Sequence, residues 1–96
     1  MAVSFSVRAI PRYEQMVRKL MKRHPELGDI QHSVREILAT DPYNQSRQHN
    51  IKKLEGIRSG EGQYRLSLGR WRFRYDIFKQ EVVLHYCGLR RENTYS

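Results

Sequence analysis

Polar and apolar residues alternate at the start of the chain and then take up the spacing of helices. Over residues 3–7 every second side chain is apolar, which predicts a half-buried strand. Pro11 ends this strand, and over residues 12–23 the apolar residues recur three and four positions apart, as on one helical face. A second stretch of this kind, residues 30–39, follows Asp29, a residue type favoured at a helix N-cap. The short link between the two stretches predicts an antiparallel pair of helices.

The last third of the chain has the alternation that is typical of strands. Residues 64–68 and 71–78 alternate in this way, whereas residues 82–86 are nearly continuously apolar, as expected of a central strand covered on both faces. Residues 43–63, which precede them, are polar and irregular, and we expect a connector with one short helical turn. The order strand, helix, helix, strand, strand, strand predicts a single α+β domain over residues 1–96. In this domain a helical hairpin packs on a small, mainly antiparallel sheet.

The charge balance favours a polyanionic partner. The 96 residues include 18 Lys and Arg against 10 Asp and Glu, a formal net charge of +8. Such a surplus fits nucleic acid or an acidic protein, with a solubilising surface charge as the alternative. No stretch approaches the ~18 apolar residues of a membrane span. The first residues also lack the pattern of a secretory signal, so we expect a cytoplasmic protein without membrane contact.

The inventory of cysteine and histidine predicts neither a disulfide framework nor a metal site. Cys87 is the single cysteine, and the four histidines are dispersed along the chain. We therefore expect no metal and no cofactor.

Strand alternation brings several arginines onto one face of the predicted sheet. Arg65 on one strand, and Arg72 and Arg74 on the next, alternate with apolar residues. If the two strands pair, all three project from the same face. Further basic residues flank these strands: Lys52, Lys53, Arg90 and Arg91. A solvated outer face is one interpretation, but the planar fork of arginine also suits phosphate.

Other notable side chains receive structural interpretations. The helix charges, such as Arg18, Lys19 and Lys22, are expected on a solvated face. The alternation of aromatic residues in the last third, Tyr86 among them, favours core positions over base-stacking positions. His85 is interpreted as a packed or partly exposed strand residue and not as a catalyst.

An ordered set of short motifs resembles the RelE/ParE superfamily of bacterial and archaeal toxins. The motifs are KLEG at 53–56, YRLSLG at 64–69, WRFRYDI at 71–77 and GLRR at 88–91, followed by Tyr95. The predicted element order agrees with the fold of that family. The resemblance implies the toxin of a toxin–antitoxin pair, with a cognate antitoxin as its partner.

The superfamily contains two activities. RelE-like members cleave messenger RNA in the ribosomal decoding site without metal, whereas ParE-like members inhibit DNA gyrase. RelE-like cleavage implies attack of a ribose 2′-hydroxyl on the adjacent phosphate. That attack requires a proton acceptor, cations for the developing charge and a proton donor for the leaving oxygen.

The resemblance also implies a functional role for each residue that occupies a position of the RelE-like motifs. The resemblance assigns catalytic roles to Arg65, Arg72, Arg90 and Tyr95. It assigns RNA-binding roles to Lys52, Lys53, Arg74 and Arg91. Ser67 and Leu89 stand where RelE-like members have a lysine and a histidine, so the general base stays open. A gyrase inhibitor and a non-catalytic RNA-binding domain are the alternatives.

Overall fold

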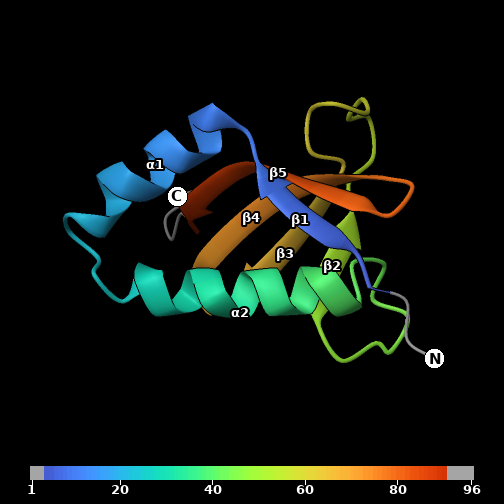
Figure 1. Ribbon diagram of the computed structural model, residues 1–96, viewed down its shortest axis with the longest axis horizontal. Coiled ribbons are helices and arrows are strands. Elements are labelled where there is room, and N and C mark those ends of the chain that lie inside the picture. The colour runs from blue at the N-terminus through green and yellow to red at the C-terminus, as the bar shows by residue number, and fades with distance from the viewer. Residues whose placement is uncertain (1–3, 91–96) are drawn as a thin grey trace, which may run out of the picture.

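Two helices lie against one face of a five-stranded sheet in the computed structural model, which describes residues 4–90 (Figure 1). The strands are β1 (Ser6–Ala9), β2 (Asn50–Lys53), β3 (Tyr64–Leu68), β4 (Trp71–Phe78) and β5 (Glu81–Leu89), and the helices are α1 (Pro11–Met21) and α2 (Leu27–Thr40). The sheet order is β1-β5-β4-β3-β2, with β1 parallel to β5 and all other pairs antiparallel. The predicted α+β class is confirmed.

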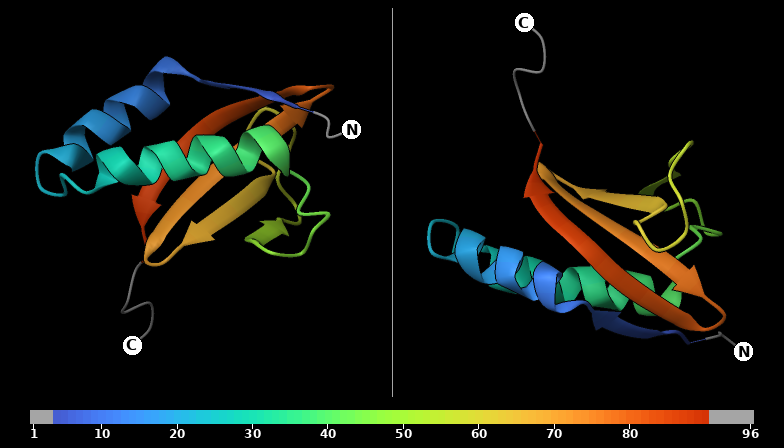
Figure 2. Two further views of the ribbon diagram at one scale, coloured as in Figure 1. Left: turned by 60° about the horizontal axis from the view of Figure 1, so that its bottom comes forward. Right: turned by 90° about the horizontal axis from the view of Figure 1, so that it is seen from above.

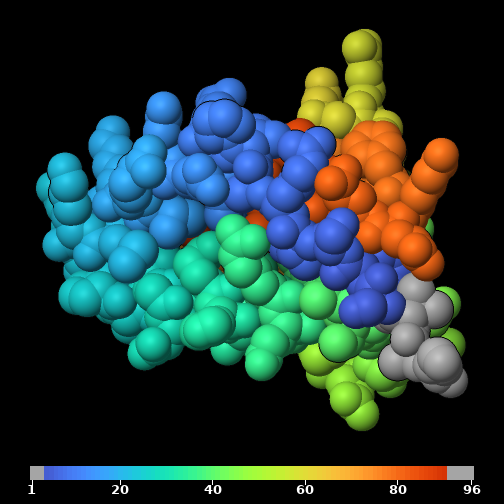
Figure 3. Space-filling view, in the orientation of Figure 1, coloured from blue at the N-terminus to red at the C-terminus, as the bar shows by residue number. Residues whose placement is uncertain are grey.

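The core lies between the helices and the sheet. Fully buried side chains from the helices, Tyr13, Leu27, Val34 and Leu38, pack against Leu66, Phe73, Tyr75 and Leu84 from the strands. Figure 2 shows both helices on the same side of the sheet, and Figure 3 shows how fully their side chains cover it. Burial of this apolar surface is the main source of stability in such a domain. It also raises the pKa of the Cys87 thiol to about 12.

Several predicted boundaries move in the structure. The first strand runs over Ser6–Ala9, whereas the prediction was 3–7, and residues 1–3 lie outside the described part of the chain. The helix predicted at 30–39 begins at Leu27, because that side chain is wholly buried and the first turn forms around it. Asp29 therefore lies in the first turn of α2 and not at its N-cap, where its charge still suits the helix dipole.

The strand β2 was not predicted. The connector 43–63 was expected to hold a helical turn, which is wrong, because Asn50–Lys53 pair with β3 as an antiparallel edge strand. Four residues with a single apolar side chain, Ile51, show no alternation that could be recognised. Backbone pairing with β3 and the contact of Ile51 with the core hold the strand in place.

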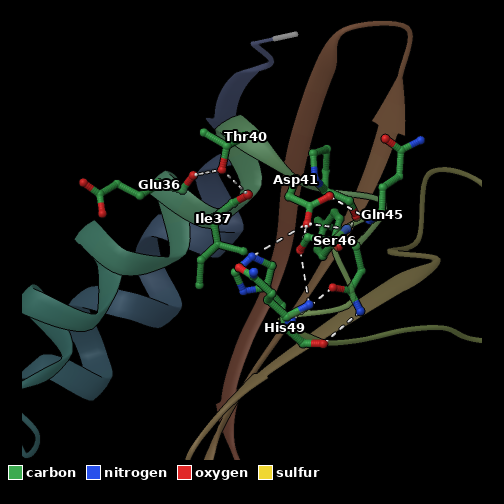
Figure 4. Close-up of polar contacts among 11 residues, drawn as sticks. Glu36, Ile37, Thr40, Asp41, Gln45, Ser46 and His49 are labelled. Carbon is green, nitrogen blue, oxygen red and sulfur yellow. Dashed lines mark hydrogen bonds and ion pairs between the residues drawn. The ribbon is translucent and has the colours of Figure 1, made fainter. Parts of the chain in front are cut away.

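The segment between α2 and β2 is organised by the carboxylate of Asp41 (Figure 4). This carboxylate accepts hydrogen bonds from the backbone N–H groups of Gln45 and Ser46 and from the Ser46 hydroxyl. His49 Nε2 lies 3.8 Å from its Oδ2. Burial alone would raise the pKa of Asp41, but these hydrogen bonds and the nearby His49 lower it below its usual value. The charged carboxylate thus fixes the path of the chain into β2.

The lowered pKa of Asp41 predicts a pH-dependent contribution to stability. Because the folded-state pKa lies below the unfolded value, this contribution is present above about pH 3.8 and is lost as the pH falls through the folded pKa. We expect Asp41→Asn to lower the free energy of unfolding by about 1–2 kcal/mol at pH 7. Urea denaturation from pH 7 down to pH 2 should show that difference shrinking, whereas Glu55→Gln, at an exposed position, should show no such trend. A difference that stays constant with pH would contradict the expectation.

Neither helix of the described residues has the length and apolar character needed to cross a membrane.

Candidate nucleic-acid interface

The sheet face that points away from the helices carries most of the predicted site residues. Strand pairing places Lys52 opposite Arg65, Arg65 opposite Arg74, and Arg72 opposite Ser67. Paired residues project from the same side of a sheet, and the residues between them, such as Leu66 and Phe73, point into the core. The prediction that Arg65, Arg72 and Arg74 share one face is confirmed. We call Lys52, Arg65, Arg72, Arg74 and Arg90 the basic face.

Arg72 lies in the middle of the positive charge. Its Nη1 donates to the carbonyl oxygens of Gly69, at 2.8 Å, and Trp71, at 3.0 Å, which fixes the guanidinium at the β3–β4 turn. Its pKa is lowered, first by burial and then by the charges of Arg90 and Arg65. Arginine stays protonated despite such a shift. The strand register places Arg65 diagonally across from Arg72, and the backbone of Arg90 is bonded to Arg70 beside the same turn, so the three cations are neighbours. Among residues 4–90 none of these three arginines forms an ion pair.

Arg65 has a hydrogen-bond donor without a partner. Its Nε is buried, and no described residue accepts a hydrogen bond from it. An unpaired buried donor costs about 1–3 kcal/mol. The guanidinium of Arg65 also has terminal donors, and phosphate oxygens are acceptors that arginine binds well.

Two of the residues assigned to RNA binding have other contacts in the structure. Arg74 donates from Nε to the Gly62 carbonyl, at 3.1 Å, and from Nη2 to the Glu61 carbonyl, at 2.9 Å. It therefore holds a loop on the sheet and has fewer donors left for a ligand. Lys53 pairs with Tyr64 and points to the helix side, with Nζ 5.8 Å from the Tyr64 ring centroid. By register Lys53 is thus on the other side of β2 from Lys52, although both lysines and Arg74 line one hollow at this edge of the sheet.

The residues that follow β5 lie at or beyond the end of the described chain. The backbone N–H of Arg90 donates to the Arg70 carbonyl, which anchors Arg90 next to the β3–β4 turn. This position explains why the charge of Arg90 contributes to the lowered pKa of Arg72. Arg91 and Tyr95, both predicted site residues, lie outside the described residues.

A buried carboxylate supports the loop beside the basic face. Asp76 is 1% exposed. It accepts hydrogen bonds from the backbone N–H groups of Gly60, Gly62 and Gln63 at 2.9–3.0 Å. His85 Nε2 lies 2.9 Å from Asp76 Oδ2. The loop is thus tied to β4 by the side chains of Asp76 and Arg74, and it covers part of the sheet face.

A β-bulge adds two residues that sequence reasoning missed. Arg74 is opposite Tyr86 but Tyr75 is opposite Leu84, so β5 has one residue more than β4 at this point. Leu84 and Cys87 both face the core, and His85 and Tyr86 between them both face away from the helices. The interpretation of Tyr86 as a core residue is wrong, since its side chain is 39% exposed. An interpretation that assumes strict alternation of side chains along a strand cannot detect a β-bulge, because the bulge shifts the alternation by one residue.

A hollow borders the basic face next to these two residues. Its lining includes Arg12 from α1, Glu61 from the loop, and Arg74, His85 and Tyr86 from the sheet, together with Gly60 and the apolar Ile10 and Met16. It therefore combines positive charge with an exposed aromatic ring, which is the composition of a nucleotide-binding surface.

In comparisons with known proteins, no family model, curated protein or solved structure matches the chain.

Proposed function

We propose that this protein is the toxin of a toxin–antitoxin pair, a RelE-like member of the RelE/ParE superfamily that cleaves messenger RNA without a metal ion in the ribosomal decoding site. The observation that carries the proposal is the cluster of Arg72, Arg65 and Arg90, three neighbouring cations without an acidic partner among residues 4–90. Keeping like charges together is unfavourable unless an anion binds between them. Their placement on a sheet face outside the core supports a role in binding.

The proposed chemistry is transfer of a phosphate ester within the RNA. The ribose 2′-hydroxyl gives up its proton to solvent as its oxygen attacks the adjacent phosphorus, the bond to the 5′-oxygen of the next nucleotide breaks, and a 2′,3′-cyclic phosphate and a 5′-hydroxyl result. Arg72 and Arg65 stabilise the charge that develops on the phosphate oxygens, and Arg90 adds to the same field. Tyr95 is the proposed group for proton transfer to the leaving oxygen.

The proposed partner is an acidic antitoxin, which keeps the toxin inactive in the cytoplasm. Support comes from a groove between α1 and β5 that combines apolar and basic residues, among them Met16, Leu20, Leu89, Lys19, Lys22 and Arg23. Tyr86 also lines this groove, so a bound antitoxin would cover its ring. The parallel strand β1 accompanies β5 only as far as Leu84, so the groove lies along a part of β5 that β1 does not cover. An acidic amphipathic segment would match both the charge and the apolar floor.

Addition of the purified protein to a translating extract tests the proposal. We expect cleavage of messages within codons, products with 2′,3′-cyclic phosphate and 5′-hydroxyl ends, and undiminished cleavage of ribosome-bound message after chelation of metals other than magnesium. The alternatives predict different results. Intact messages with accumulating DNA breaks in growing cells would favour a gyrase inhibitor. Salt-sensitive RNA binding without cleavage would favour a non-catalytic RNA-binding domain.

A further inference from the structure

Tyr86 is an exposed aromatic residue in a strongly basic environment. Its neighbours across the strands are Arg74 directly opposite and Arg72 two positions along β4. Arg12 lines the same hollow from the start of α1. A tyrosine on this face adds nothing to the core, which lies on the other side of the sheet.

Gly88 lets the ring of Tyr86 lie along the strand. A Cβ atom at Gly88 would come within 2.2 Å of the Tyr86 hydroxyl oxygen and 2.7 Å of Cζ, so the ring occupies the space of the missing side chain. Gly88 is itself paired with Arg72 on β4. Neighbouring strands are about 4.8 Å apart, so the ring lies directly beside the strand position of Arg72.

We propose that Tyr86 is a stacking platform for a nucleobase of single-stranded RNA whose neighbouring phosphate is held by Arg72 and Arg65. The inference rests on the proposed function and narrows its substrate class. The ring of Tyr86 presents a flat apolar surface next to the cations. This combination of aromatic platform and cationic backbone contacts is the usual way in which proteins hold single strands.

The arrangement selects single strands over duplexes. In a double helix both faces of each base are already stacked, and arginines alone could only contact the backbone. An unstacked base, in contrast, can lie on Tyr86 while its phosphate reaches Arg72. The bulge in β5 is what brings a second residue, His85, to the same side without moving Tyr86 away from Arg74.

Binding of short single-stranded 2′-O-methyl RNA tests the inference. One oligomer carries 2-aminopurine at a single position, and a matched oligomer is abasic there. The methyl group blocks the attacking oxygen, so binding is measured without cleavage. We expect Tyr86→Ala to bind the base-carrying oligomer about tenfold more weakly and to lose the fluorescence quenching, with unchanged affinity for the abasic oligomer.

Two further variants sharpen the test. Tyr86→Phe keeps the ring and should behave as the wild type. Gly88→Ala displaces the ring without removing it and should reproduce the loss seen with Tyr86→Ala. If Tyr86→Ala binds both oligomers like the wild type, the inference is wrong and the ring is available for a protein partner. An equal loss for both oligomers, or no binding by the wild type, would also overturn it.

The stacking role and the proposed nuclease activity can fail separately. Base-dependent binding in the absence of any cleavage of natural messages would refute the nuclease and leave the stacking role. Cleavage that is unchanged in Tyr86→Ala, together with equal binding of both oligomers, would refute the stacking role and leave the nuclease.

Discussion

Replacing Arg72 by alanine is expected to slow message cleavage by about 100- to 1,000-fold, the usual effect of removing one donor that stabilises a developing oxyanion. Arg72 is the central member of the basic face, and its pKa is lowered first by burial and then by the charges of Arg90 and Arg65. Its Nη1 is committed to the β3–β4 turn, which leaves the rest of the fork to face an anion. The rate is measured by primer extension on messages in the translating extract.

Matched variants separate the loss of catalysis from loss of the fold. Arg18→Ala removes a charge from the exposed face of α1 and should leave cleavage within about twofold of the wild type, since surface charges there are screened. Arg72→Lys keeps the charge but loses the fork, and an intermediate rate is expected. Urea denaturation should show that Arg72→Ala loses no more than about 1 kcal/mol. Cleavage within tenfold of the wild type in a folded Arg72→Ala protein would argue against the assignment.

Replacing Asp76 by alanine is expected to lower the free energy of unfolding by about 3–4 kcal/mol. The change leaves the N–H groups of Gly60, Gly62 and Gln63 without an acceptor, and each unsatisfied buried donor costs about 1–3 kcal/mol. The expected loss is smaller than three full penalties because part of the loop can move so that its N–H groups form hydrogen bonds with water. The loss is a large share of the roughly 5–15 kcal/mol that stabilises a small domain.

Urea denaturation at pH 7 measures the effect of Asp76→Ala, and two comparisons locate its source. His85→Ala removes only the single contact with Asp76 Oδ2 and leaves the three backbone hydrogen bonds of the loop, so it should cost about 1 kcal/mol or less. Gly62→Ala should loosen the same loop, since a Cβ there would lie 2.9 Å from the Arg74 Cβ at a backbone φ of +86°. Gly56→Ala, with a similar φ of +76° but open space around it, is its control. A loss below about 1 kcal/mol for Asp76→Ala would show that the loop does not depend on this carboxylate.

The shared face of the arginines could be predicted from the sequence because it depends on strand period alone. Arg65, Arg72 and Arg74 alternate with residues that the core requires, so the hydrophobic pattern determines their side of the sheet. The side of the sheet on which Lys53 lies could not be predicted in this way, because β2 is too short to show an alternation of apolar and polar residues. Side-chain hydrogen bonds are a further limit: no pattern indicates that Arg74 binds the carbonyls of residues 61 and 62.

The position of Tyr86 could not be predicted because a bulge is a property of paired strands. The run Leu84, His85, Tyr86 and Cys87 is nearly apolar, and by itself it is compatible with a regular buried strand. The extra residue can be recognised only from the pairing register between β4 and β5. The buried Asp76 is similar, since its acceptors are satisfied by a loop more than ten residues away in the chain.

The parallel pairing of β1 with β5 has a consequence for the order of events during synthesis. Ser6 is opposite Glu81, so β1 has no strand neighbour until more than seventy further residues have been made and β5 has emerged. The two helices are complete long before, but the sheet on which their apolar faces pack is still missing. The basic face therefore assembles late, when β3, β4 and β5 have all left the ribosome. A nascent chain carries Arg65, Arg72 and Arg74 before β5 and Arg90 are present to complete the face.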